Sequence, residues 1–134
     1  MKRLLVLGAG TAGTMAINKL RPMLPESEWQ ITVVEPSDVH HYQPGYLFLP
    51  FGAYTPEETI ESTDRFIPEG VTRVRAEVDR VDPDTNVVHL MGGDTLPYDY
   101  LIIATGTSPR PDQTPGMGES LFHNVHQRRS TSGY

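Results

Sequence analysis

The chain has 134 residues, of which 37% are hydrophobic, and a formal net charge of -6 at pH 7. Its length and composition fit one folded domain, and the negative charge argues against nucleic acid as a partner, because phosphate binding needs clustered lysine and arginine. Cysteine is absent, which excludes disulfides and thiol chemistry within these residues, and no apolar run approaches the roughly 20 residues of a membrane-spanning helix.

The chain opens with an apolar segment, residues 4–7, which predicts a strand buried on both faces of a parallel sheet. This segment leads into residues 8–13, GAGTAG, which match the pattern G-x-G-x-x-G. A helix is expected over residues 11–20, with an apolar face toward the sheet, and Pro22 is expected to end it.

Each glycine of this loop has a physical reason in a phosphate-binding turn. Gly8 permits the tight turn, Gly10 lets a pyrophosphate approach the backbone, and Gly13 lets the helix pack close to the strand. The free amides and the positive dipole end of the helix then favour a dianionic pyrophosphate without any lysine.

A second strand is expected over residues 31–34, and it ends on Glu35. This is the spacing at which an acid binds the adenosine ribose in such folds. A carboxylate accepts hydrogen bonds from the ribose hydroxyls and repels a 2′-phosphate. NADP is therefore disfavoured as a ligand, whereas NAD and FAD both remain.

The next segment, residues 36–46, is rich in aromatic residues and turn formers. It follows the carboxyl end of the second strand, where open α/β sheets bind ligands. One interpretation places this segment beside an extended cofactor, with Pro44 and Gly45 shaped against a flat ring. The other is a packed surface loop, and for His40 and His41 taken singly we favour it.

Thr55 is expected to cap a short helix, in one or two pieces, that ends near Pro68. The acids Glu57, Glu58 and Glu61 lie in this segment. They are more typical of the solvated first turn of a helix than of a catalytic cluster.

Three extended runs separated by turns follow, over residues 71–81, 87–90 and 95–98. They predict an antiparallel meander inserted into the α/β unit. Residues 98–106, YDYLIIATG, then return to the central sheet and end in small residues that leave room for a ligand. The predicted fold is therefore α/β, with a parallel sheet plus an inserted antiparallel β-meander.

The glycine loop, Glu35 and residues 98–106 together resemble the pyridine nucleotide-disulfide oxidoreductase superfamily of flavoproteins. Residues 41–46, HYQPGY, and 49–52, LPFG, look most like sulfide:quinone oxidoreductases and their flavocytochrome relatives. Type II NADH dehydrogenases share the same frame. The resemblance implies a Rossmann-like FAD-binding domain over residues 1–118, incomplete as it stands.

The resemblance also implies how FAD is held. The pyrophosphate would lie at the glycine loop, the adenosine ribose on Glu35, adenine beside the strand of Val78, and the flavin near Pro44 and Gly45. Residues expected to bind FAD are Gly8, Gly10, Thr11, Ala12, Gly13, Glu35, Pro36, Pro44, Gly45, Val78, Ala104, Thr105 and Gly106. No side chain is assigned as catalytic or as a metal ligand.

Members of the superfamily are considerably longer. Their second dinucleotide domain, the returning segment that contacts the flavin, the redox-active cysteines and the membrane-dipping helices match nothing in this sequence. Residues 119–134 match no expected element and shift to a basic, polar composition. We therefore expect a truncated product with an irregular, disordered tail.

Three functions fit these observations. The first is the FAD-binding portion of an oxidoreductase that passes electrons from sulfide through FAD to quinone, with a type II NADH dehydrogenase-like fragment as its variant. The second is a stand-alone module that holds FAD, NAD or AMP without turnover, and the third is a folded remnant without ligand. Exposed apolar surface predicts a homo-oligomer. The expected setting is cytoplasmic, with the complete enzyme peripheral to the inner face of the membrane.

Overall fold

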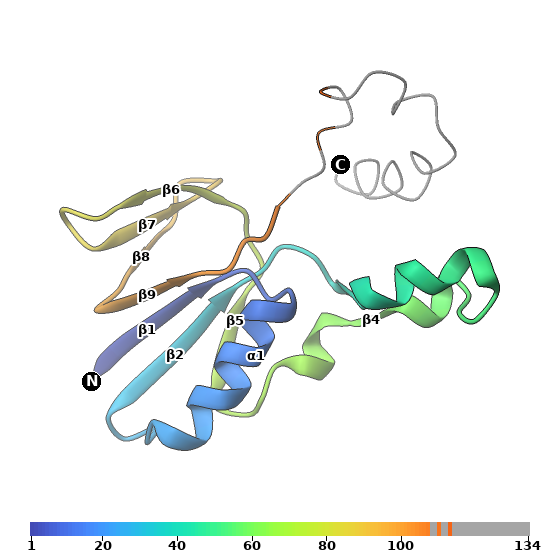
Figure 1. Ribbon diagram of the computed structural model, residues 1–134. Coiled ribbons are helices and arrows are strands. Elements are labelled where there is room, and N and C mark those ends of the chain that lie inside the picture. The colour runs from blue at the N-terminus through green and yellow to red at the C-terminus, as the bar shows by residue number, and fades with distance from the viewer. Residues whose placement is uncertain (108–109, 111–112, 114–134) are drawn as a thin grey trace.

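The computed structural model describes residues 1–107, 110 and 113. A parallel four-stranded sheet forms the centre of this part of the chain (Figure 1), with the strand order β5-β2-β1-β9. The strands are β1 (Lys2–Leu7), β2 (Trp29–Val34), β5 (Val71–Val74) and β9 (Tyr100–Ile103). The predicted domain boundary at residue 118 and the tail over residues 119–134 lie outside the described residues.

The register of the sheet brings the carboxyl ends of all four strands to one edge. Leu7 of β1 lies opposite both Val34 of β2 and Ile103 of β9, and Val34 lies opposite Val74 of β5. The segments that follow these strands therefore meet at this edge, where open parallel sheets bind their ligands.

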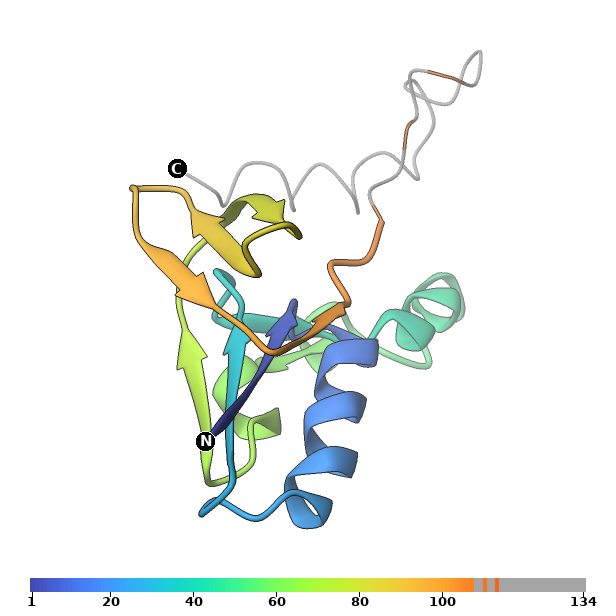
Figure 2. The ribbon, with the colours of Figure 1, turned by 90° about the vertical axis from the view of Figure 1, so that its left-hand side faces the viewer.

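Helix α1 (Thr11–Leu20) has the predicted bounds and lies against one face of the sheet (Figure 2). Its Ile17 is fully buried against a cluster that includes Leu4 and Val6 of β1. The chain continues into a 3-10 turn, η1 (Arg21–Met23), which contains Pro22. The α-helix thus ends before Pro22, as the missing amide of proline requires.

The opposite face of the sheet packs on an antiparallel meander. Its strands are β6 (Val78–Asp82), β7 (Val87–Leu90) and β8 (Thr95–Pro97). Leu5 and Leu7 of β1 pack there with Val88 and Leu90 of β7. Because successive side chains of a strand point to opposite faces, the short apolar run of β1 fills both cores, as predicted.

The prediction of one extended run over residues 71–81 is wrong in one respect. Residues 71–74 form β5, which pairs in parallel with β2 in the central sheet, and only the later residues form β6 of the meander. The chain leaves the sheet between them, over residues 75–77. A single β-rich stretch of sequence therefore serves two different sheets.

Residues 39–66 form an arm that projects away from the central sheet in Figure 1. Its elements are β3 (Val39–His41), η2 (Gln43–Phe51), η3 (Glu57–Thr59), β4 (Ile60–Ser62) and η4 (Thr63–Phe66). Strands β3 and β4 pair antiparallel and join the arm to the sheet edge. No helix of the described residues is long and apolar enough to cross a membrane.

The helix predicted after Thr55 forms only as two short 3-10 pieces, η3 and η4, although its capping signal is present. The Thr55 amide donates to Glu58 Oε2 at 2.7 Å, and the Glu58 amide approaches Thr55 Oγ1 at 3.4 Å, which is the reciprocal pattern of a capping box. The 3-10 turn η3 follows directly, and Ile60 then begins strand β4 opposite His41, which separates η3 from η4. Strand pairing ends the helical segment after one turn.

Arg3 and Asp99 tie the start of β1 to the turn before β9. The Arg3 amide donates to Asp99 Oδ2 at 2.6 Å, and Nη2 of the Arg3 side chain donates to Asp99 Oδ1 at 2.9 Å. In return, the Asp99 amide donates to the Arg3 carbonyl at 2.9 Å. The hydrogen bonds from the Arg3 side chain and amide lower the pKa of Asp99 from 3.8 to about 2.

Replacing Asp99 by Asn should therefore lower the urea midpoint of unfolding most at neutral pH. Because the pKa of Asp99 is lower in the folded state, its contribution is fully present above about pH 4 and is lost as the pH falls toward 2. Urea unfolding at neutral and acidic pH measures this, with Asp94→Asn in an exposed turn as the control for losing one carboxylate. A difference from the unsubstituted protein that is equal at both pH values contradicts the expectation.

Candidate functional site

A hollow of about 600 Å³ lies at the carboxyl edge of the parallel sheet. Its walls are the glycine loop over residues 8–12, Glu35 and Ser37 after β2, strand β3, and residues 104–107 after β9. The register of the parallel sheet brings together the segments after β1, β2 and β9, and β3 adds a wall from the arm.

Two of the three motif glycines are required by the packing of the chain itself. Gly8 has φ +94, and a Cβ there would lie 2.5 Å from the carbonyl oxygen of Ala104. A Cβ on Gly13 would overlap the carbonyl oxygen of Gly8. Any side chain at these positions would force α1 and β9 away from the end of β1.

Gly10 differs from the other two glycines. Its φ is -70, which any residue adopts, and, apart from Gly10 itself and its two chain neighbours, no heavy atom of the described residues lies within 4 Å of a Cβ built there. Nothing in the described chain therefore requires glycine at this position. The missing side chain keeps the start of α1 open to the hollow, where an approaching ligand would otherwise meet a methyl group.

The start of α1 offers an anion both amides and a favourable field. Gly10 is the N-cap and Thr11 the first helical residue, and both line the hollow. The first turn contains no acidic residue that would neutralise the positive end of the helix dipole. These features suit a phosphate group, which needs several N–H donors and no counter-charge from a lysine.

Glu35 places its carboxylate against the glycine loop. Oε2 accepts from the Ala9 amide at 2.8 Å, and Oε1 accepts from the Ser37 amide at 2.9 Å. An ionised carboxylate has about four acceptor sites, so about two remain for a ligand that donates hydrogen bonds. A pair of vicinal hydroxyls matches this acceptor, and a second anion does not.

His40 holds the same loop from the other side. Its Nδ1 lies 3.0 Å from the carbonyl oxygen of Ala9, and because that oxygen can only accept, Nδ1 carries the hydrogen. The ring packs on Phe66, with the two centroids 4.3 Å apart. Ala9 is thus held through its amide by Glu35 and through its carbonyl by His40, a contact that the sequence did not predict.

Thirteen residues were expected to contact the cofactor, and eight of them line the hollow. These are Gly8, Gly10, Thr11, Ala12, Glu35, Ala104, Thr105 and Gly106. In the part of the chain that the structure describes, the other five do not line it. They are Gly13, Pro36, Pro44, Gly45 and Val78.

The five residues have other surroundings. Gly13 lies against Gly8 under the loop, while Val78 packs its side chain into the core between the sheet and the meander. Gly45 is buried, and a Cβ there would lie 2.9 Å from the ring of Tyr42. Pro36 and Pro44 are exposed beside the hollow. Contacts from all thirteen residues to a cofactor stay predictions.

Sequence reasoning missed several residues at the hollow, among them Ser37 and Thr63. Thr63 is 1% exposed and donates from Oγ1 to the Ser37 carbonyl at 2.9 Å. Farther along the hollow, the Tyr46 hydroxyl and His41 Nδ1 are 2.6 Å apart. No local sequence signal marks Thr63, because only the pairing of β3 with β4 brings it beside Ser37.

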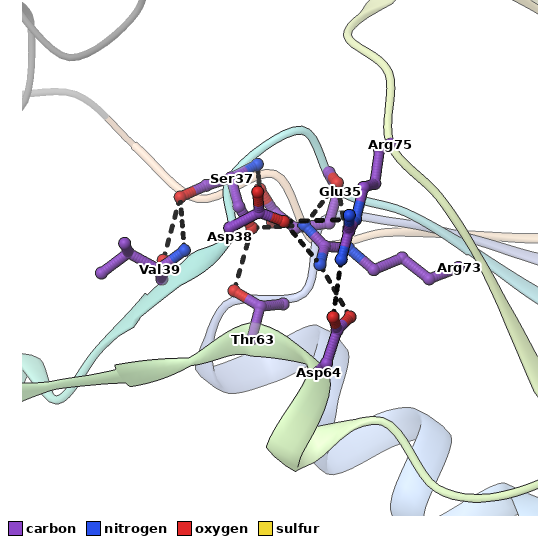
Figure 3. Close-up of polar contacts among 8 residues, drawn as sticks. All are labelled: Glu35, Ser37, Asp38, Val39, Thr63, Asp64, Arg73 and Arg75. Atoms are coloured by element: carbon purple, nitrogen blue, oxygen red, sulfur yellow. Dashed lines mark hydrogen bonds and ion pairs between the residues drawn. The ribbon is translucent and has the colours of Figure 1, made fainter.

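Four charged residues form a network behind Glu35 (Figure 3). Arg73 Nη1 lies 2.8 Å from Asp64 Oδ1 and 3.0 Å from Asp38 Oδ1, and Arg75 reaches the same two carboxylates. The hydrogen bond from Arg73 is the largest cause that lowers the pKa of Asp64, and the charges of both arginines add to it. Asp64 therefore stays ionised at neutral pH.

The different roles of Gly13 and Gly10 give opposite expectations for folding stability. Gly13→Ala should lower the free energy of unfolding by more than about 2 kcal/mol, because the added methyl overlaps a backbone carbonyl. Gly10→Ala should change it by less than about 1 kcal/mol, the scale of an altered N-cap. Urea unfolding followed by circular dichroism compares the two, and similar losses for both variants would contradict this geometry.

Known proteins show similar sequences and folds. The chain is 30% identical over 122 residues to the mitochondrial sulfide:quinone oxidoreductase of Dictyostelium discoideum, covering 91% of this chain and 27% of that protein. It is 28% identical over 135 aligned positions to the type II NADH:quinone oxidoreductase of Staphylococcus saprophyticus, covering 98% of this chain and 33% of that protein. The chain thus spans about a third or less of the length of these relatives.

The X-ray structure of sulfide:quinone oxidoreductase from Aquifex aeolicus has the same fold over 98% of this chain and 32% of its own, with a TM-score of 0.75 and 22% identity. The predicted Rossmann-like α/β fold is therefore confirmed. Residues 2–134 match the family described as pyridine nucleotide-disulphide oxidoreductase, whose members are flavoenzymes. With the glycine loop, the acid after β2 and the small-residue segment after β9 in one hollow, this chain belongs to the pyridine nucleotide-disulphide oxidoreductase family.

Proposed function

We propose that this chain binds FAD by its adenosine diphosphate half, in the hollow at the carboxyl edge of the sheet. The observation that carries the proposal is Gly10, whose missing side chain serves no packing purpose within the described residues and leaves the start of α1 open. A close approach by a pyrophosphate gives this glycine a physical reason. Family membership supports a flavin as the cofactor.

The residues around the hollow suit the separate parts of such a ligand. Backbone amides at Gly10 and Thr11 would donate to the pyrophosphate, and the Glu35 carboxylate would accept from the ribose hydroxyls. The small residues at 104–106 leave space beside the glycine loop. Bound FAD would supply the redox chemistry, while these residues bind and orient it.

We further propose that, within a longer protein, this portion takes part in electron transfer to a quinone. The relatives are named sulfide:quinone oxidoreductase and type II NADH:quinone oxidoreductase. Both names give quinone as the electron acceptor, and they differ in the electron donor. Greater similarity to the first kind favours sulfide as the donor. Because this sequence has no cysteine, any thiol chemistry on sulfide would need residues outside it.

The direct test of FAD binding is the visible absorption spectrum of the purified chain after incubation with FAD and removal of free ligand. The unsubstituted protein should retain about one FAD per chain, and Gly10→Ala should weaken its affinity by at least about tenfold. The reason is steric, since a methyl at this position would occupy the approach to the amides.

The stability measurement on the same variant serves as the control for this test. A folded Gly10→Ala protein that lacks flavin supports the site. Retention of FAD by Gly10→Ala with undiminished affinity would contradict the placement of the pyrophosphate, and a colourless unsubstituted protein would contradict FAD binding itself.

Self-association is a separate proposal. Tyr100 and Ile103 of β9 are 51% and 65% exposed, and in the described part of the chain this strand pairs only with β1. An apolar strand edge of this kind tends to pair with another chain.

The predicted cytoplasmic setting also stays a prediction.

Sedimentation velocity should accordingly show a dimer or larger assembly that Ile103→Lys weakens, since a charged edge disfavours strand pairing. Met91→Lys, in an exposed turn of the meander, is the matched control and should leave the assembly unchanged. A monodisperse monomer for the unsubstituted protein would overturn this expectation.

A further inference from the structure

Arg73 is unusually enclosed for a charged residue near the end of a strand. Its side chain is 6% exposed, whereas those of Asp38, Asp64 and Arg75 are all more than half exposed. Figure 3 shows the Arg73 side chain reaching from β5 toward the segment over residues 35–38. Burial of this cation requires hydrogen-bond partners and counter-charges, and the structure supplies both.

The guanidinium binds the backbone directly after β2. Its Nη2 donates to the Glu35 carbonyl at 3.1 Å and to the Ser37 carbonyl at 2.6 Å, and its Nε donates to the Glu35 carbonyl at 3.3 Å. The chain leaves the sheet here, after the Glu35 amide donates to the Val74 carbonyl at 3.0 Å. Beyond the end of the β2–β5 pairing, Arg73 therefore supplies the hydrogen-bond donors for the carbonyls of Glu35 and Ser37.

The same segment carries the acceptor of the hollow. Arg73 fixes the backbone of Glu35, while the amides of Ala9 and Ser37 fix its carboxylate. The Ser37 carbonyl, which Arg73 also binds, belongs to the residue whose amide donates to Glu35 Oε1. Movement of this segment would therefore displace the carboxylate from the glycine loop.

In the described residues, Arg73 forms its ion pairs with Asp38 and Asp64 and not with the Glu35 carboxylate. In the described part of the chain, Arg73 meets Glu35 at its carbonyl oxygen, and its ion pairs go to Asp38 and Asp64. Two carboxylates thus balance the two arginines of the network. The remaining acceptor sites of Glu35 face the hollow without competition from the nearby guanidinium.

We propose that Arg73 is a positioning residue for recognition of the adenosine ribose: by binding the carbonyls of Glu35 and Ser37, it holds the Glu35 carboxylate where it accepts from the ribose hydroxyls. The inference rests on the proposed dinucleotide function. It extends that function to a side chain that does not itself line the hollow.

Two ligands separate positioning from a purely structural role. ADP carries the ribose hydroxyls, and 2′,3′-dideoxy-ADP lacks them but keeps the adenine and the pyrophosphate. A variant that only loosens the fold weakens both ligands alike. A variant that misplaces the Glu35 carboxylate reduces the preference for ADP, which is the ratio of the two dissociation constants.

The experiment measures both dissociation constants by calorimetry for the unsubstituted chain, Arg73→Met and Arg75→Met. The unsubstituted protein should prefer ADP by about tenfold or more, the value of hydrogen bonds to a charged acceptor. Arg73→Met should bring the preference close to one. Arg75→Met removes the same charge from the same two carboxylates but leaves the carbonyls bound, so it should keep the preference.

Each outcome has a defined meaning. An unchanged preference in Arg73→Met overturns the inference and leaves the proposed function intact. Equal binding of both ligands by the unsubstituted chain overturns the inference together with the proposed role of Glu35, and leaves FAD binding at the hollow intact. If the unsubstituted chain binds none of ADP, 2′,3′-dideoxy-ADP and FAD, both the proposed function and the inference are overturned. If Arg73→Met does not fold, Arg73→Lys keeps the charge without the planar fork, and a full preference there counts against positioning.

Discussion

Three backbone segments come into close contact at the end of β1, and the site depends on this contact. Gly8 lies against the carbonyl of Ala104, and Gly13 lies against the carbonyl of Gly8, so neither position has room for a Cβ. This packing brings the first turn of α1 and the segment after β9 to the end of one strand. A hollow bounded by helix amides on one side and by Glu35 on another follows from that geometry.

Local sequence signals predicted the central βαβ unit well, and they failed where long-range pairing decides. The apolar run of β1, the glycine loop and the bounds of α1 each follow from residues adjacent in sequence. The capping box at Thr55 is equally local and forms, yet no α-helix follows it, because Ile60 pairs with His41 of a distant strand. Residues 71–81 look like one extended run in the sequence for the same reason, since β-propensity does not show which strand each part will pair with.

In the candidate site, too, local sequence patterns predicted some residues, and long-range packing determines the others. The glycines and Glu35 could be found because their spacing is fixed within one unit. His40 and Arg73 could not, because they act on residues 31 and 38 positions away in the sequence, and those contacts exist only after the arm and β5 have packed. Sequence thus identified the residues that would touch a ligand more readily than the residues that hold them in place.

The double attachment of Ala9 bears on the entropy of binding. A glycine-containing loop ordinarily samples many backbone conformations, and restricting each residue to one costs about 1–2 kcal/mol. Here Glu35 and His40 restrain one peptide segment before any ligand arrives. Much of the conformational cost of forming the loop is then part of folding rather than of binding, and the loop is preorganised for its ligand.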